Sequence, residues 1–155
     1  MAQSLEVTET INNGKTYSTE ITKSYNSRFV KRARGVAVGS DNFTEVFMKG
    51  RATKDLRRVR QDYATVLAAI NGLEQTLLGN DRVMSLTVKA RGGDLESNIT
   101  PYLQMFPKND VVEFYADPND SGDSIVITQA GKNNQERQVW TVDEDYAGVK
   151  ALWLL

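Results

Sequence analysis

The chain has 155 residues, with 19 lysines and arginines, 20 aspartates and glutamates, and neither cysteine nor histidine. The absent cysteines exclude disulfides and thiolate metal sites, and the absent histidines exclude the commonest general base and metal ligand. The chain does not open with a secretory signal pattern, and no apolar run is long enough to span a bilayer. We therefore expect a cytoplasmic protein, or a virion protein if the source is viral, that is not secreted by a signal peptide and has no membrane partner.

Charge is unevenly distributed along the chain. Residues 23–60 contain eleven basic and three acidic residues, a net charge of +8, whereas the rest of the chain contains eight basic and seventeen acidic residues, a net charge of −9. Such separation indicates either a polyanionic partner or contact between oppositely charged parts of neighbouring copies. Two solvated faces without a partner are the alternative interpretation.

The predicted elements begin with a β-hairpin at residues 4–24. Residues 5–11 alternate between apolar and polar side chains, Asn13-Gly14 supplies the positive φ angles of a tight turn, and residues 16–22 resemble a second strand. Because both strands are polar, we predict a projecting arm or a sheet edge. Residues 27–39 are predicted as strand or loop, and residues 42–49 as a strand.

A long central helix at about residues 54–78 is predicted next. Thr53 is a suitable N-cap, Gly79-Asn80 is a suitable end, and apolar residues recur at alternating intervals of three and four. The residues of this stripe are Leu56, Val59, Tyr63, Val66, Ile70, Leu73 and Leu77. A helix lying across a sheet explains the stripe, and a coiled-coil seam with another copy is the alternative.

A strand at residues 82–89 precedes a short second helix at about residues 101–106, for which Thr100 is a cap and Pro101 the first residue. Four further strands are predicted, at residues 111–115, 124–129, 136–142 and 149–154. We find no internal repeat and no dividing linker. The prediction is therefore one α+β domain over residues 1–155, with mostly antiparallel strands around one long central helix.

No motif for catalysis or for a cofactor stands out. The glycine-paired loops at residues 35–39 and 91–94 lack the spacing of nucleotide-binding motifs. Residues 117–123 partly match the start of a calcium loop, but the twelfth position is Thr128 instead of glutamate. We therefore predict a non-enzymatic protein with no cofactor and no metal, and we identify no small-molecule substrate.

Self-assembly is the leading functional hypothesis. Opposite charges on the two parts of the chain suit a homo-oligomer or a larger particle, and the polar strands are typical of a virion component such as a phage capsid, decoration or tail subunit. The apolar C-terminus supplies a predicted contact between copies, formed by Trp153, Leu154 and Leu155. Burial of the same residues in a last core strand is the alternative.

A nucleic-acid-binding module is the second hypothesis. Two basic stretches, residues 28–34 and 51–60, offer cations to a phosphate backbone. The residues assigned to this role are Arg28, Lys31, Arg32, Arg34, Lys54, Arg57 and Arg58. Such a module predicts binding that weakens steeply as the salt concentration rises.

Overall fold

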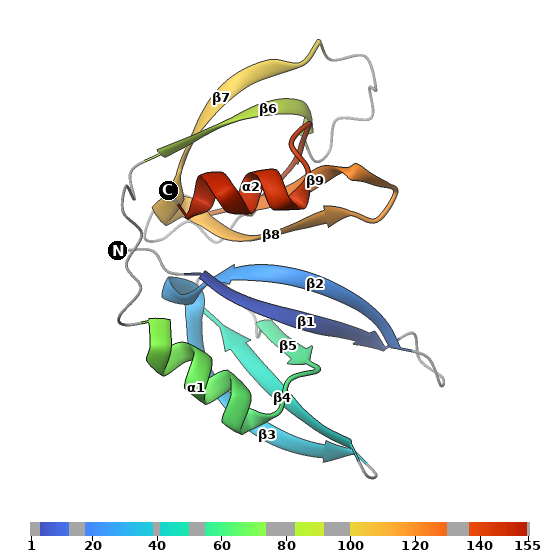
Figure 1. Ribbon diagram of the computed structural model, residues 1–155, viewed down its shortest axis with the longest axis vertical. Helices are drawn as coiled ribbons and strands as arrows, with labels where there is room; N and C mark the ends of the chain where they lie inside the picture. The colour runs from blue at the N-terminus through green and yellow to red at the C-terminus, as the bar shows by residue number, and fades with distance from the viewer. Residues whose placement is uncertain are drawn as a thin grey trace.

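Figure 1 shows the computed structural model, in which the described residues form a ten-stranded antiparallel sheet with two short helices. The structure describes residues 4–12, 18–38, 41–49, 55–73, 83–91, 100–129 and 137–154. No helix within these ranges is long and apolar enough to cross a membrane. The predicted arrangement of strands around one long central helix is wrong, because the helical share of the chain is small and the sheet dominates.

We call the first half of the chain the first unit, and its described residues form five strands, a 3-10 turn and a helix. Its strands lie in the order β3-β4-β5-β1-β2 across the sheet. The elements in chain order are β1 (Ser4–Asn12), β2 (Ser18–Asn26), η1 (Ser27–Phe29), β3 (Val30–Val38), β4 (Asp41–Met48), β5 (Asp55–Val59) and α1 (Tyr63–Leu73).

The second half, called the second unit, repeats this order element by element. Its strands continue the same sheet in the order β8-β9-β10-β6-β7, which is the first unit's order with each number raised by five. Figure 1 shows the two units one above the other, with β2 next to β8 where they meet. The elements are β6 (Val83–Arg91), β7 (Tyr102–Pro107), η2 (Lys108–Asp110), β8 (Val111–Asp117), β9 (Asp120–Thr128), β10 (Gln138–Val142) and α2 (Tyr146–Trp153).

The repetition extends to individual hydrogen bonds. In the first unit, Gln61 Oε1 accepts a hydrogen bond from the Thr8 N–H at 3.0 Å. In the second unit, Glu144 Oε1 accepts one from the Thr87 N–H at 2.9 Å. The β3–β4 and β8–β9 ladders also carry a register shift at their corresponding ends. The two units are therefore built to one plan.

The amino-acid sequence carries a trace of this plan. Residues 59–68 read VRQDYATVLA and residues 142–151 read VDEDYAGVKA, which agree at six of ten positions. Both segments contain the end of the fifth strand of their unit and the start of its helix. The prediction that the chain has no internal repeat is therefore wrong.

β5 and α1 replace the long helix predicted at residues 54–78. Residues 55–59 pair with β4 and β1, and the helix begins only after Asp62, whose Oδ1 accepts a hydrogen bond from the Thr65 N–H at 2.8 Å. The apolar stripe misled the prediction because the apolar residues of β5 and those of α1 are spaced at intervals of three and four, as in one helix, although a turn separates the two elements. Residues 74–78 lie outside the described residues.

Two other local predictions are wrong for the same kind of reason. The helix predicted at residues 101–106 forms most of β7, because residues 102–107 pair along β6 and this pairing overrides the local Thr-Pro signal. The strand predicted at residues 149–154 belongs to α2, whose N-cap Asp145 accepts a hydrogen bond from the Gly148 N–H at 2.7 Å.

The predicted hairpin is confirmed, with Ser4 opposite Asn26 and Asn12 opposite Ser18. Its turn, residues 13–17, lies outside the described residues. The hairpin occupies the middle of the sheet, where β1 pairs with β5 at Glu9 and β2 pairs with β8 over residues 23–25. In the described part of the chain, residues 18–22 of β2 pair with β1 alone. The base of the predicted arm is thus built into the sheet.

Each unit has its own hydrophobic core, and the two cores lie on opposite faces of the sheet. Tyr25 is fully buried in the first core with Val66 of α1, whereas Phe114 lies in the second core with Trp153 of α2. At the junction it is Ser24, the neighbour of Tyr25, that stands opposite Phe114. Because successive residues of a strand point to opposite faces, α1 and α2 cover opposite faces of the sheet.

Candidate functional site

The junction between the units is a short antiparallel pairing of β2 with β8. Lys23 stands opposite Tyr115, Ser24 opposite Phe114, and Tyr25 opposite Glu113. The first core extends across it, because Val112 and Ile127 of the second unit pack with the first unit's apolar residues. The junction therefore joins the units by backbone pairing and by shared apolar packing.

A buried ionic network crosses one face of this junction. Lys23 Nζ lies 3.2 Å from Glu9 Oε1 and 3.1 Å from Glu113 Oε1. Arg57 contacts the same two carboxylates and also Asp55, with its Nε 2.8 Å from Asp55 Oδ1. Arg137 of the second unit completes the network, with its Nη1 2.6 Å from Asp55 Oδ2. Three cations and three carboxylates are thus balanced in a buried site, as charges removed from water require.

The protonation equilibria of this site follow from burial and from these partners. Burial raises the pKa of Asp55, but the hydrogen bonds and charges of Arg57 and Arg137 outweigh burial and hold that pKa below its ordinary value. Burial and the nearby Glu113 and Glu9 carboxylates raise the pKa of Tyr115 to about 12. The Asp55 carboxylate therefore stays ionised and Tyr115 stays neutral near pH 7.

On the other face, α2 of the second unit reaches across the junction onto the first. The Tyr146 hydroxyl donates a hydrogen bond to Glu6 Oε2 at 2.6 Å and lies 2.7 Å from Ser24 Oγ. Lys150 Nζ donates to the same Glu6 oxygen at 2.7 Å. The hydrogen bonds from Lys150 and Tyr146 hold the pKa of Glu6 below its ordinary value. We call these four residues the α2 clasp.

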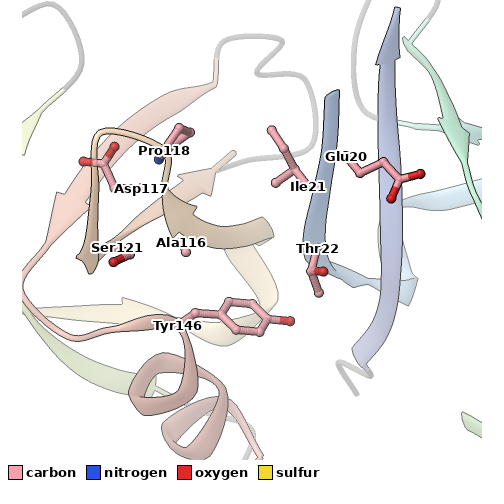
Figure 2. A pocket seen from close by; sticks show the side chains of 8 residues that line it. All are labelled: Glu20, Ile21, Thr22, Ala116, Asp117, Pro118, Ser121 and Tyr146. Atoms are coloured by element: carbon pink, nitrogen blue, oxygen red, sulfur yellow. The ribbon is translucent and has the colours of Figure 1, made fainter. Parts of the chain in front are cut away.

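A cavity of about 390 Å³ lies beside the α2 clasp, where β2 and the β8–β9 hairpin separate. Figure 2 shows Tyr146 directing its hydroxyl toward β2, with Ile21 and Thr22 on one side of the cavity and the β8–β9 turn on the other. The Asp117 carboxylate in that turn accepts a hydrogen bond from the Asn119 N–H at 2.9 Å. In the described part of the chain, no three acidic side chains are grouped closely enough to hold a metal ion.

β3 and β7 are the two end strands of the sheet among the described residues. β7 exposes Leu103 at 74% and Met105 at 69%, although both are large and apolar. At the β3 end, Tyr63 and Leu67 of α1 are exposed at 44% and 43%. Unpaired backbone groups with apolar side chains beside them are what an end strand offers to another strand.

Four arginines lie on the face of the first unit opposite α1, and we call them the arginine face. Arg32 and Arg34 stack over the Phe47 ring, and Arg58 and Arg60 stack over the Phe43 ring, at 4.4–5.7 Å from guanidinium to ring centre. Glu45 stands between Arg34 and Arg58 in the strand register and binds both. Four cations with few acidic partners leave this face positively charged.

The residues predicted to contact nucleic acid do not all share this face. Arg32, Arg34 and Arg58 do, whereas Arg28 is exposed on η1 and Lys31 is exposed at the start of β3. Arg57 instead belongs to the buried ionic network, because its side chain points to the other side of β5 from that of Arg58. Lys54 lies outside the described residues.

The apolar C-terminus lies partly in the core of its own chain. Trp153 is 1% exposed and its ring lies 5.8 Å from that of Phe114, so this side chain serves the second core. Leu154 is 46% exposed, and Leu155 lies outside the described residues. Of the predicted C-terminal contact, the structure thus leaves Leu154 on the surface.

The sequence prediction missed the buried ionic network. Glu9 and Lys23 alternate in step with the apolar Leu5, Val7 and Tyr25, so they lie on the same face of the hairpin. This alternation is the sequence signal from which burial of the two charged residues could have been predicted.

No family model, curated protein or solved structure matches this chain in comparisons with known proteins.

Proposed function

We propose that this protein is a structural subunit that assembles with copies of itself through the ends of its sheet. The observation that carries the proposal is the exposure of Leu103 and Met105 on β7, an end strand among the described residues. Most of the side-chain surface of these two residues faces water, and covering it by another molecule would be favourable. The opposite end, with Tyr63 and Leu67, offers a second apolar surface of the same kind.

The charges of the two units support contact between copies. Residues 1–73 contain twelve basic and seven acidic residues, a net charge of +5, and residues 74–155 contain seven basic and thirteen acidic residues, a net charge of −6. A first unit that meets the second unit of another copy therefore places opposite charges next to each other. Such attraction is screened by salt, whereas apolar burial is not.

The mass of the purified protein in solution tests this proposal. We expect light scattering after size exclusion to give masses above the 17.3 kDa of one chain, rising with protein concentration. We also expect the assemblies to loosen as the salt concentration rises, because the long-range attraction between the units is screened. A mass of one chain at every concentration and salt level would contradict the proposal.

The arginine face favours a second candidate function, the binding of nucleic acid. In the second unit, the strand positions equivalent to Arg32 and Arg34 are Glu113 and Tyr115, so the cations are particular to the first unit. Arginines spread over a sheet surface suit the phosphates of a nucleic-acid backbone. The two functions share β3, because Arg32 and Arg34 lie on this end strand with their side chains on the face of the sheet, whereas Arg58 belongs to the interior strand β5.

Reversing the charge of the arginine face tests this second candidate. We expect Arg32→Glu with Arg34→Glu to weaken the binding of a fluorescent DNA oligonucleotide by an order of magnitude or more and to flatten its salt dependence, because each lost phosphate contact removes about one unit of slope. Arg91→Glu, which changes an exposed cation at the end of β6 in the second unit, serves as the control and should change little. Equal binding by the double variant and the wild type, measured by fluorescence anisotropy, would reject nucleic acid as the ligand of this face.

A further inference from the structure

We propose that the junction between the two units is the template for the contact between copies, in which β7 of one copy pairs with β3 of the next. This inference rests on the proposed self-assembly and specifies its partner, its edges and its register. β2 of the first unit pairs with β8 of the second unit. The equivalent of β2 in the second unit is β7, and the equivalent of β8 in the first unit is β3. The two strands that hold the units together are thus matched by the two end strands of the described sheet.

The equivalence fixes the register of the proposed pairing. Asn26 and Pro107 immediately precede the 3-10 turns η1 and η2, and Val30 and Val111 immediately follow them. The difference in residue number is the same for Asn26 and Pro107 as for Val30 and Val111. Each residue of β2 and β3 therefore corresponds to the residue of β7 or β8 that lies this same number of positions later in the chain. The observed pairs across the junction become three pairs between copies, which are Gln104 with Arg34, Met105 with Ala33, and Phe106 with Arg32.

The exposed apolar residues stand where this docking would cover them. Met105 corresponds to Ser24, which is 1% exposed beneath α2, whereas Met105 is 69% exposed. Tyr63 and Leu67 of α1 correspond to Tyr146 and Lys150 of the α2 clasp, because both helices begin at the same step of their units. An α1 from the next copy would therefore lie over Met105 as α2 lies over Ser24, with apolar contacts in place of polar ones.

The β3 end is shaped for such a contact. A Cβ atom on Gly35 would lie 3.2 Å from Tyr63 Cβ, so glycine lets the start of α1 sit close against β3. Tyr63 stands at this edge as Tyr146 stands at the junction, where its hydroxyl crosses to the neighbouring unit. The edge of β3 and the start of α1 thus form one surface, as β8 and α2 do inside the chain.

Charge selects the head-to-tail arrangement over pairing of two identical ends. β3 carries Lys31, Arg32 and Arg34, so two β3 strands side by side would place like charges opposite each other. β7 carries no charged residue, and it belongs to the acidic second unit. A contact between different ends leaves one end free on each side, and it therefore produces rings or open chains of subunits instead of closed pairs.

Cysteine cross-linking between two different variants tests the register. The chain has no cysteine of its own, so Ala33→Cys and Met105→Cys each introduce a single thiol. We expect the mixed variants to form a disulfide between one copy of each under mild oxidation, because opposite residues on neighbouring strands lie within reach of a disulfide. The pair Arg34→Cys and Gln104→Cys is a second matched pair, which replaces the first if Ala33→Cys does not fold.

Two control mixtures make the result specific. Arg34→Cys with Met105→Cys represents a slip of one residue, which points the thiols to opposite faces, and should cross-link at least tenfold less. Val139→Cys with Met105→Cys tests random collision, because Val139 is 38% exposed on the interior strand β10. If the wild type assembles but Met105→Cys links only to itself, the head-to-tail docking is overturned while self-assembly stands. If the wild type is a single chain at every concentration, both proposals fail.

Discussion

Replacing Arg57 by methionine is expected to lower the free energy of unfolding by about 3–5 kcal/mol, because it removes one of the three cations that balance three buried carboxylates. Arg57 contacts Glu9, Asp55 and Glu113, whose side chains are 2–9% exposed. Lys23 and Arg137 stay in place, so the three carboxylates then share two cations and one buried negative charge is left uncompensated. Urea unfolding followed by tryptophan fluorescence measures the loss, at one fixed protein concentration because assembly also changes apparent stability.

The neighbouring Arg58 provides a matched control for this prediction. Its side chain is 36% exposed on the arginine face, and Arg58→Met is expected to change the free energy of unfolding by about 0.5 kcal/mol or less. Adding Glu113→Gln to Arg57→Met should restore part of the lost stability, since the unpaired charge is then removed. Equal stability of the Arg57 and Arg58 variants would contradict the assignment of Arg57 to a buried network.

Blocking either end of the sheet is expected to reduce the assemblies to single chains. Leu103→Lys with Met105→Lys places two charges on β7, and charged side chains are a common means of preventing pairing at a sheet edge. Tyr63→Glu with Leu67→Glu does the same beside β3. All four residues are more than 40% exposed, so we expect little loss of folding stability. Light scattering after size exclusion should give the mass of one chain for both variants.

Val139→Lys is the matched control for the blocked ends. Val139 is an exposed apolar residue, but it lies on β10, which has neighbours on both sides. This variant should assemble as the wild type does, because its end strands are unchanged. Assembly of Leu103→Lys with Met105→Lys at the wild-type level would show that β7 is not a contact between copies.

Local sequence signals predicted most of the strands but not the helices. Alternation and an Asn-Gly turn identified the β1–β2 hairpin, because these signals act over a few residues. The predicted helix at residues 54–78 failed because helical spacing was read across the turn that separates β5 from α1. The turn is visible in the structure as the Asp62 cap, and the equivalent Asp145 starts α2. Comparing the two DYA segments would have placed both helix starts.

The candidate site was harder to predict, because it depends on pairings between residues far apart in the sequence. Glu113 meets Lys23 and Arg57 only once β2 has paired with β8 and β5 with β1. A basic stretch at residues 51–60 does not show that Arg57 and Arg58 point to opposite sides of a strand. The exposure of Met105 likewise follows from the position of β7 at an end of the sheet, which its own residues do not specify.

Mixing the two end-blocked variants tests the central claim most directly. The variant with Leu103→Lys and Met105→Lys keeps a free β3 end, and the variant with Tyr63→Glu and Leu67→Glu keeps a free β7 end. If copies join head to tail, the equimolar mixture should form a discrete dimer with twice the 17.3 kDa mass, although each variant alone is a single chain. A mixture that stays at one chain's mass while the wild type assembles, or either variant forming dimers alone, would contradict head-to-tail assembly through β3 and β7.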